Sequence, residues 1–217
     1  MVLNGLGFWF GTGASSLVSR MLGARENRHA DVITSTAFFL ALSVGLLVTA
    51  VGLTTGESLM RLLGATRTLM PYALAYGRFI FIAAPFCIGS LVLSKGLCAE
   101  GKSRESMVGQ VTGGVLNMAL DPLFIFVCHW GITGAAAATA LSQVMVWAAL
   151  LWFYVRGKTS VRISVRQVAR TPRMVKLIFT TGFPSLCRHC GNALATIVLN
   201  RAAGGFGDAA IAAFSIA

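Results

Sequence analysis

Residues 106–128 read SMVGQVTGGVLNMALDPLFIFVC, a run of 23 residues in which Asp121 is the only charged side chain. At a rise of about 1.5 Å per residue, a helix of this length crosses the roughly 30 Å hydrocarbon layer of a membrane. Five more long apolar runs follow the same pattern, at residues 3–22, 31–55, 71–97, 131–155 and 174–200. Only helices and closed barrels satisfy every backbone polar group in lipid, and these runs lack the alternation of barrel strands. The sequence therefore predicts an all-α polytopic membrane protein with six transmembrane helices.

The composition excludes the main soluble classes. The chain is 56% hydrophobic and only 12% charged, whereas a soluble domain carries about 25% charged residues. Disorder is excluded because it requires low hydrophobicity. The net charge of +11 raises the possibility of nucleic-acid binding. No basic stretch contains the interleaved aromatic residues that stack on bases, so the predicted partner is the lipid bilayer and not nucleic acid.

Basic residues are concentrated in alternate connections between the runs. The segments 20–28, 95–104 and 156–176 together contain thirteen Lys and Arg, whereas the other two connections contain only two. Lys and Arg accumulate in cytoplasmic loops of membrane proteins. The asymmetry places these three segments on the cytoplasmic side of an inner or plasma membrane that the chain crosses several times.

One acid lies well inside a predicted span. Asp121 is seven residues from the outer end of its run at Cys128, and Asn117 precedes it by four residues, on the same helical face. Pro122 has no backbone N–H, which frees a carbonyl in the preceding turn. Carboxylate, amide and carbonyl oxygens suit a hard cation such as Na⁺, or a proton. The competing interpretation is that Asp121 only hydrogen-bonds within the helix bundle.

Thr139 lies in the following antiparallel run, about two turns from its start at Gly131, at a depth similar to that of Asp121. Its hydroxyl is a candidate to complete the site, although a Thr that bonds to its own helix is the commoner arrangement.

Two further candidates lie in the last run. Pro184, next to the Gly182-Phe183 pair, predicts a kinked helix, and Arg188 follows one turn later. Arg188 has three interpretations: pairing with an acid, contact with a substrate, or reaching for the membrane interface. We treat Pro184 and Arg188 as candidates for a substrate cavity.

The sequence lacks the motifs of familiar enzymes. It has no nucleotide-binding loop and no H-E-x-x-H or G-x-S-x-G motif. The five cysteines form neither a disulfide framework nor a paired zinc motif, and small buried thiols are the expectation for them. The prediction is a protein that is not an enzyme, binds no cofactor and functions in transport.

Several motifs together resemble the MATE (multidrug and toxic compound extrusion) transporters. They follow the family's order along nearly the whole chain: Gly11-x-Gly13-Ala14 with Ser19-Arg20-x-x-Gly23-Ala24, Leu62-Leu63-Gly64-Ala65, Ala75-Tyr76-x-Arg78, Pro85-Phe86, Gly101-Lys102-Ser103-Arg104, Asn117-x-x-x-Asp121-Pro122, Gly131-x-x-Gly134-Ala135-Ala136-x-Ala138-Thr139 and Gly182-x-Pro184-Ser185.

This resemblance implies a piece of a twelve-helix protein made of two six-helix lobes, covering about its second to seventh helices. Residues 1–155 correspond to an incomplete N-terminal lobe of five helices, 156–172 to the basic inter-lobe loop, and 173–217 to the start of the C-terminal lobe. Residues 208–217 would begin a seventh span of this chain. The resemblance further implies a monomer that exports amphipathic, often cationic, small molecules in exchange for Na⁺ or protons.

The family's first-lobe coupling site maps onto Asn117, Asp121 and Thr139, which predicts a site for Na⁺ or a proton at these three residues. Two alternatives remain at this stage. A flippase of lipid-linked oligosaccharides, from the same superfamily, would use cations such as Arg188 to hold anionic lipid phosphates. A membrane subunit that transports nothing would use its buried polar residues for packing alone.

Overall fold

The computed structural model of the chain describes residues 2–62, 70–157, 159–164 and 172–204. All regular structure within these ranges is helical. The elements are α1 (Val2–Gly23), α2 (Asn27–Leu62), α3 (Met70–Ala99), α4 (Ser103–Pro122), the π-helical turn η1 (Leu123–Val127), α5 (Gly131–Val155) and α6 (Pro172–Gly204).

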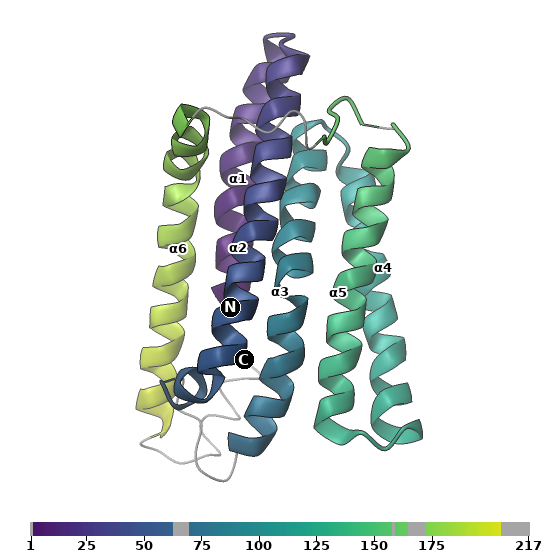
Figure 1. Ribbon diagram of the computed structural model, residues 1–217, viewed down its shortest axis with the longest axis vertical. Helices are drawn as coiled ribbons and strands as arrows, with labels where there is room; N and C mark the ends of the chain where they lie inside the picture. The colour runs from purple at the N-terminus through teal and green to yellow at the C-terminus, as the bar shows by residue number, and fades with distance from the viewer. Residues whose placement is uncertain (1, 63–69, 158, 165–171, 205–217) are drawn as a thin grey trace.

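The six long helices run up and down in one bundle (Figure 1). Each predicted apolar run lies within one long helix, or within α4 and η1 together up to Val127, so the predicted helices are confirmed. Four helical segments are long and apolar enough to cross a membrane: Asn27–Glu57, Leu74–Ala99, Ser103–Val127 and Gly131–Val155. The predicted seventh span, at residues 208–217, lies outside the described residues.

Helix α3 is the centre of the bundle. It packs against α1, α2, α4 and α5, while α6 packs mainly against α1 at the edge (Figure 1). One apolar cluster joins α1, α2, α3 and α6, and a second joins α2, α3 and α5. The division into residues 1–155 and 173–217 stays a prediction, because α6 packs on α1 as closely as neighbours within a single bundle do.

The packing of α2 on α3 compensates for a proline in the middle of a span. Pro85 has no N–H to donate to the carbonyl of Phe81, four residues earlier. The Thr49 hydroxyl of α2 donates to that carbonyl at 2.6 Å. Gly45 makes the close approach possible, because a side chain there would collide with Pro85. The hydrogen bond thus supplies the partner that a bilayer cannot offer.

Helix α2 bends near its C-terminal end. Thr55 has non-helical backbone angles (φ −112°, ψ 16°), and its hydroxyl bonds to the carbonyl of Val51 at 2.7 Å. The neighbouring Thr54 hydroxyl bonds to the carbonyl of Ala50 at 2.9 Å. Hydroxyl groups that bond back to their own helix bend it, and two in succession account for this kink.

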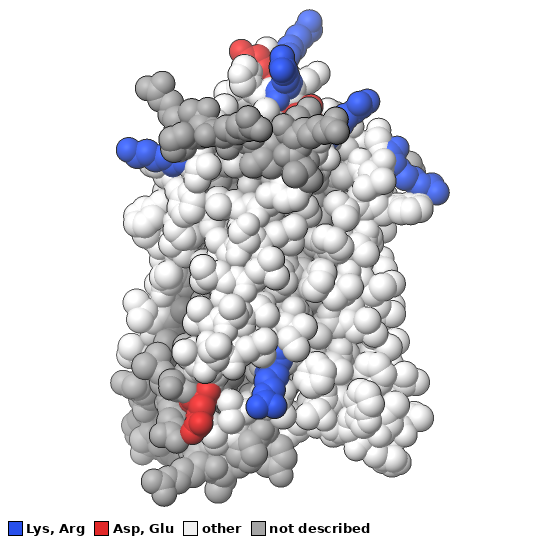
Figure 2. Space-filling view, in the orientation of Figure 1, with Lys and Arg blue, Asp and Glu red and all other residues white. Residues whose placement is uncertain are grey.

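The surface has the charge pattern of a membrane protein. Figure 2 shows Lys and Arg gathered at the end where the α1–α2 and α3–α4 connections lie, above a broad band without charge. Large apolar side chains such as Leu46, Val115 and Met118 are exposed. The expectation of buried thiols is wrong for four of the five cysteines, since only Cys87 is partly buried and Cys98, Cys128, Cys187 and Cys190 are exposed. A thiol is apolar enough to face lipid as readily as a protein core.

The described residues 159–164 of the long basic connection are bonded to the bundle by two acids. The buried Glu100 carboxylate accepts from the backbone N–H of Ser160 at 2.6 Å and from the Lys102 ammonium at 3.0 Å. The Asp31 carboxylate accepts from the backbone N–H of Arg162 at 2.7 Å. Residues 159–164 therefore lie against the basic ends of α2 and α3.

Replacement of Glu100 by Ala is expected to release this segment and speed trypsin cleavage after Arg156 and Arg162 about tenfold or more. The loss of charge-assisted hydrogen bonds costs about 1.5–3 kcal/mol, and native-state cleavage follows the population of the open form. Timed proteolysis of the folded protein in detergent measures the effect. Glu26→Ala, at an exposed acid of the same end of the bundle, is the control, and equal cleavage of both variants would contradict the assignment.

Candidate cation-coupling site

Glycines bring α4 and α5 close together. Side chains at Gly109 and Gly113 of α4 would collide with Leu150 and Val146 of α5. The two helices are joined by the short segment 128–130 and run antiparallel (Figure 1). This arrangement places the middle of α4 opposite the first half of α5, where the predicted site residues lie.

The structure brings Asn117 and Thr139 together. The Asn117 amide donates to the Thr139 hydroxyl at 3.5 Å, the long limit of a hydrogen bond. The same hydroxyl donates to the carbonyl of Ala135 in its own helix at 2.9 Å. The amide oxygen of Asn117 and a lone pair of Thr139 therefore remain available to a ligand.

Asp121 lies one turn further toward the C-terminal end of α4 and is half-buried. Its Oδ1 atom is buried and has no hydrogen-bond partner among the described residues. No described cation pairs with it, and it is the only Asp, Glu, Lys or Arg between residues 106 and 155. An unpaired buried carboxylate oxygen is costly, and a cation or a proton would remove that cost.

The backbone changes immediately after Asp121. Helix α4 ends at Pro122 and continues as η1, in which the Cys128 N–H bonds to the carbonyl of Leu123, five residues earlier. A wider turn next to a proline is a common feature of functional sites in helices. Because Pro122 has no N–H, the Met118 carbonyl in the turn before Asp121 lacks its helical partner, as the sequence analysis predicted.

A groove lies between the two helices beside Asn117 and Thr139. It encloses about 220 Å³. Its lining is formed by Gln110, Gly113, Gly114, Asn117, Thr139, Ser142, Gln143 and Val146. Sequence analysis singled out Asn117 and Thr139 but missed Gln110, Ser142 and Gln143. Their sequence spacing could have identified them, because Gln110 lies on the same face of α4 as Asn117, and Ser142 and Gln143 lie on the same face of α5 as Thr139.

The described part of the chain contains no cluster of three or more His, Cys, Asp and Glu side chains that could hold a metal ion. One carboxylate with neutral amide and hydroxyl oxygens fits a monovalent cation or a proton instead.

The substrate candidates on α6 lie elsewhere. Pro184 lines an open apolar groove with Trp9, Phe179, Thr180 and Phe183, of about 280 Å³, where α6 packs against α1. Arg188 is exposed and lines none of the described grooves. The structure therefore does not bring Arg188 or Pro184 to the site on α4 and α5.

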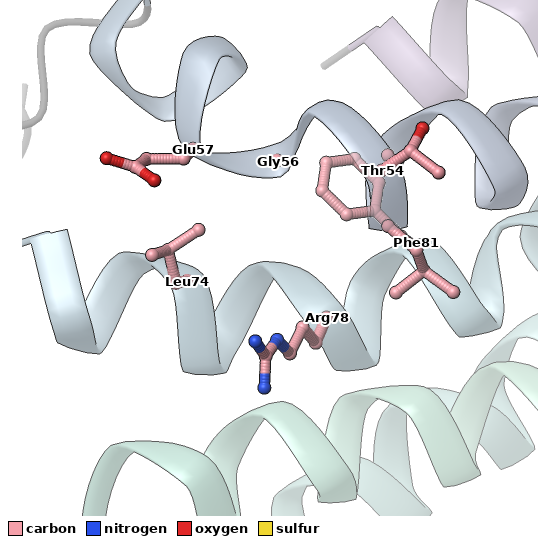
Figure 3. A pocket seen from close by; sticks show the side chains of 8 residues that line it. Thr54, Gly56, Glu57, Leu74, Arg78 and Phe81 are labelled. Atoms are coloured by element: carbon pink, nitrogen blue, oxygen red, sulfur yellow. The ribbon is translucent and has the colours of Figure 1, made fainter.

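Sequence analysis also missed a cavity between α2 and α3. It lies at the kink of α2, encloses about 220 Å³ and is lined in part by Glu57, Leu74 and Arg78. Figure 3 shows the Arg78 guanidinium directed away from α2 and the Glu57 carboxylate. The two charges are thus near neighbours of opposite sign that do not point at each other.

Comparisons with known proteins identify relatives of this chain in sequence and in fold. The profile of the MatE family matches residues 1–123. The chain is 31% identical over 215 residues to the multidrug export protein MepA of Staphylococcus saprophyticus, covering 99% of this chain and 48% of that protein. The chain spans about half the length of the curated relatives it matches.

Two similar solved structures are multidrug resistance MATE family transporters of the MOP superfamily. One is an inward-facing conformation (TM-score 0.85, 31% identity), covering 93% of this chain and 46% of the other. The second is an outward-facing conformation (TM-score 0.86, 30% identity), and the match covers 94% of this chain and 46% of the other.

Proposed function

The chain belongs to the MATE family of multidrug efflux transporters, and from this premise we propose that it takes part in cation-coupled export of small amphipathic molecules. The exchanged ion is Na⁺ or a proton, and the exported compounds are often cationic. The transported ion is a substrate of this process and not a resident cofactor.

One observation supports this proposal above all. Asp121 has a buried carboxylate oxygen with no hydrogen-bond partner in the described part of the chain, and it lies one turn from the contact between Asn117 and Thr139. Ionisable groups within a membrane span are expensive and mostly serve ion pathways or proton relays. An exporter that is driven by an ion needs a buried charge that a small cation can neutralise.

The proposed mechanism is alternating access. Similar MATE transporters have been solved in inward-facing and outward-facing conformations. A bound cation shifts the balance between two such states only if its affinity for them differs. Binding at Asp121 would remove a buried negative charge in one state, which provides that difference.

The flippase alternative has less support from the site. Lipid phosphates are anionic and would be repelled by Asp121. The one cation considered for them, Arg188, is exposed and lines none of the three grooves described above. Export of a cationic compound is therefore the function that the geometry favours.

The proposal is tested in cells that express the protein from its native gene. Cells are loaded with ethidium, de-energised, and given an inward gradient of Na⁺ or, separately, of protons. We expect one of the two gradients to accelerate ethidium efflux several-fold over cells without the gene. Equal efflux with and without the gene under both gradients would overturn the proposal.

A further inference from the structure

The groove between α4 and α5 extends beyond the three predicted coupling residues. Gln110, Ser142 and Gln143 also line it, on the side of Asn117 that leads away from Asp121. Uncharged amides and hydroxyls inside a membrane span need a reason, because each loses its water on insertion.

These polar residues follow one line along the bundle. Ser106, Gln110, Asn117 and Asp121 are separated by four, seven and four residues, so they share one face of α4. From Ser106 to Asp121 the rise is about 22 Å, most of the roughly 30 Å hydrocarbon layer. The line begins at the coupling site and ends near the basic end of the bundle, close to the start of α4 at Ser103.

Hydrogen bonds continue the line at that end. The Gln110 amide donates to the Ser94 hydroxyl of α3 at 3.3 Å. The Ser94 and Ser106 hydroxyls bond to each other at 2.7 Å, and both side chains are buried. Gln110 thus connects the groove to a pair of hydroxyls between α3 and α4.

The Ser142 hydroxyl leaves part of the groove lining without a hydrogen-bond partner among the described residues. The residue is 3% exposed, and its hydroxyl has no hydrogen-bond partner among the described residues. Buried hydroxyls almost always have a partner, so this one is available to form a hydrogen bond with a species in the groove. It faces the same groove as Asn117 and Thr139.

We propose that this groove is the path by which the coupling cation leaves Asn117, Asp121 and Thr139 for the cytoplasm, past Ser142, Gln143 and Gln110 to the Ser94–Ser106 pair. The inference rests on the proposed function. Amide and hydroxyl oxygens replace part of the hydration shell of Na⁺, and the same groups order water for a proton. None of the residues that line the groove beyond Asp121 is charged, so the cation meets no carboxylate there that would trap it.

The competing explanation is packing, since interhelical hydrogen bonds between polar side chains also hold membrane helices together. The two explanations differ in what a substitution changes. A packing residue changes stability, whereas a path residue changes the rate of ion-driven transport and leaves stability and cation binding as they were.

Two variants test the path in the protein expressed from its native gene. Gly114→Leu places a side chain into the groove without collision, because a Cβ at Gly114 meets no atom within 4 Å. Gln110→Leu keeps the volume but removes the amide. For both we expect a tenfold or greater fall in gradient-driven ethidium efflux, with an unchanged shift of Tm on addition of Na⁺ or change of pH. Gln110→Asn is expected to recover part of the rate.

Thr112→Leu is the matched control, because Thr112 is exposed, donates to the Val108 carbonyl of its own helix and is not among the residues that line the groove. Wild-type efflux in the Gly114→Leu and Gln110→Leu proteins would overturn the path. Two other results for these variants would also overturn it: a loss of the cation-dependent Tm shift, or a fall in Tm that accounts for the lost rate of efflux. If Gly114→Leu does not fold, Gln110→Leu alone decides. If the unaltered protein shows neither efflux nor a cation-dependent Tm shift, the proposed function itself fails.

Discussion

Replacement of Asp121 by Asn is expected to reduce cation-driven export to the level of cells without the gene. The substitution keeps the shape of the side chain and removes its charge. A charge pair about 4 Å apart in surroundings with an effective dielectric constant near 20 is worth about 4 kcal/mol, or about a thousandfold in cation affinity. Gradient-driven ethidium efflux measures the loss of transport, and the Tm shift on adding Na⁺, or on changing pH, measures the loss of binding.

The Tm of the Asp121→Asn protein should not fall in the absence of the cation, because the buried Oδ1 has no partner to lose among the described residues. Glu105→Gln makes the same chemical change in the first turn of α4 and is expected to export normally. Export by the Asp121→Asn protein at the wild-type rate would exclude this carboxylate as the coupling group.

The helices could be predicted from the sequence because only helices and closed barrels can span a membrane. A run such as 131–155 must satisfy its backbone internally and must be long enough to cross, so the observed α5 has the predicted bounds. The end of α2 shows the limit of this reasoning. The helix continues past Thr55 to Leu62 through a kink that depends on two threonine hydroxyls.

The rotation of each helix could not be predicted in the same way. The Thr49 hydroxyl meets the carbonyl left open by Pro85 only because Gly45 lets α2 and α3 approach. Hydropathy does not contain this information, since a lipid-facing and a protein-facing apolar side chain are energetically similar in a membrane. The same ambiguity explains why the cysteines were expected to be buried and are mostly exposed.

The candidate site was predictable to the extent that its residues are spaced on helices. Four residues separate Asn117 from Asp121, which places them on one face, and equal depth places Thr139 opposite. The contact between Asn117 and Thr139 agrees with that reasoning. The role of these residues in coupling stays a prediction, and the groove beside them required the structure, because it depends on how closely Gly113 lets α4 approach α5.

The largest structural effect is expected from Gly182→Ala, where α6 crosses α1. A Cβ at Gly182 would collide with the backbone carbonyl of Trp9, and one at Gly13 with the carbonyl of Ile178. Backbone atoms cannot rotate away as a side chain can, so the helices must separate. Their separation also strains the hydrogen bond from the Trp9 indole to the Phe179 carbonyl, which is 3.0 Å long.

We expect the Gly182→Ala substitution to cost about 3 kcal/mol and to lower Tm by about 5–10 °C. Thermal unfolding in detergent measures this effect, and the fluorescence of Trp9 reports the lost contact with Phe179 if the other tryptophans are replaced by Phe. Gly191→Ala is the matched control on the same helix. A Cβ there meets no atom within 4 Å, so it should be neutral or stabilise the helix by up to about 1 kcal/mol. Equal Tm values for the two variants would show that α6 does not depend on close backbone contact with α1.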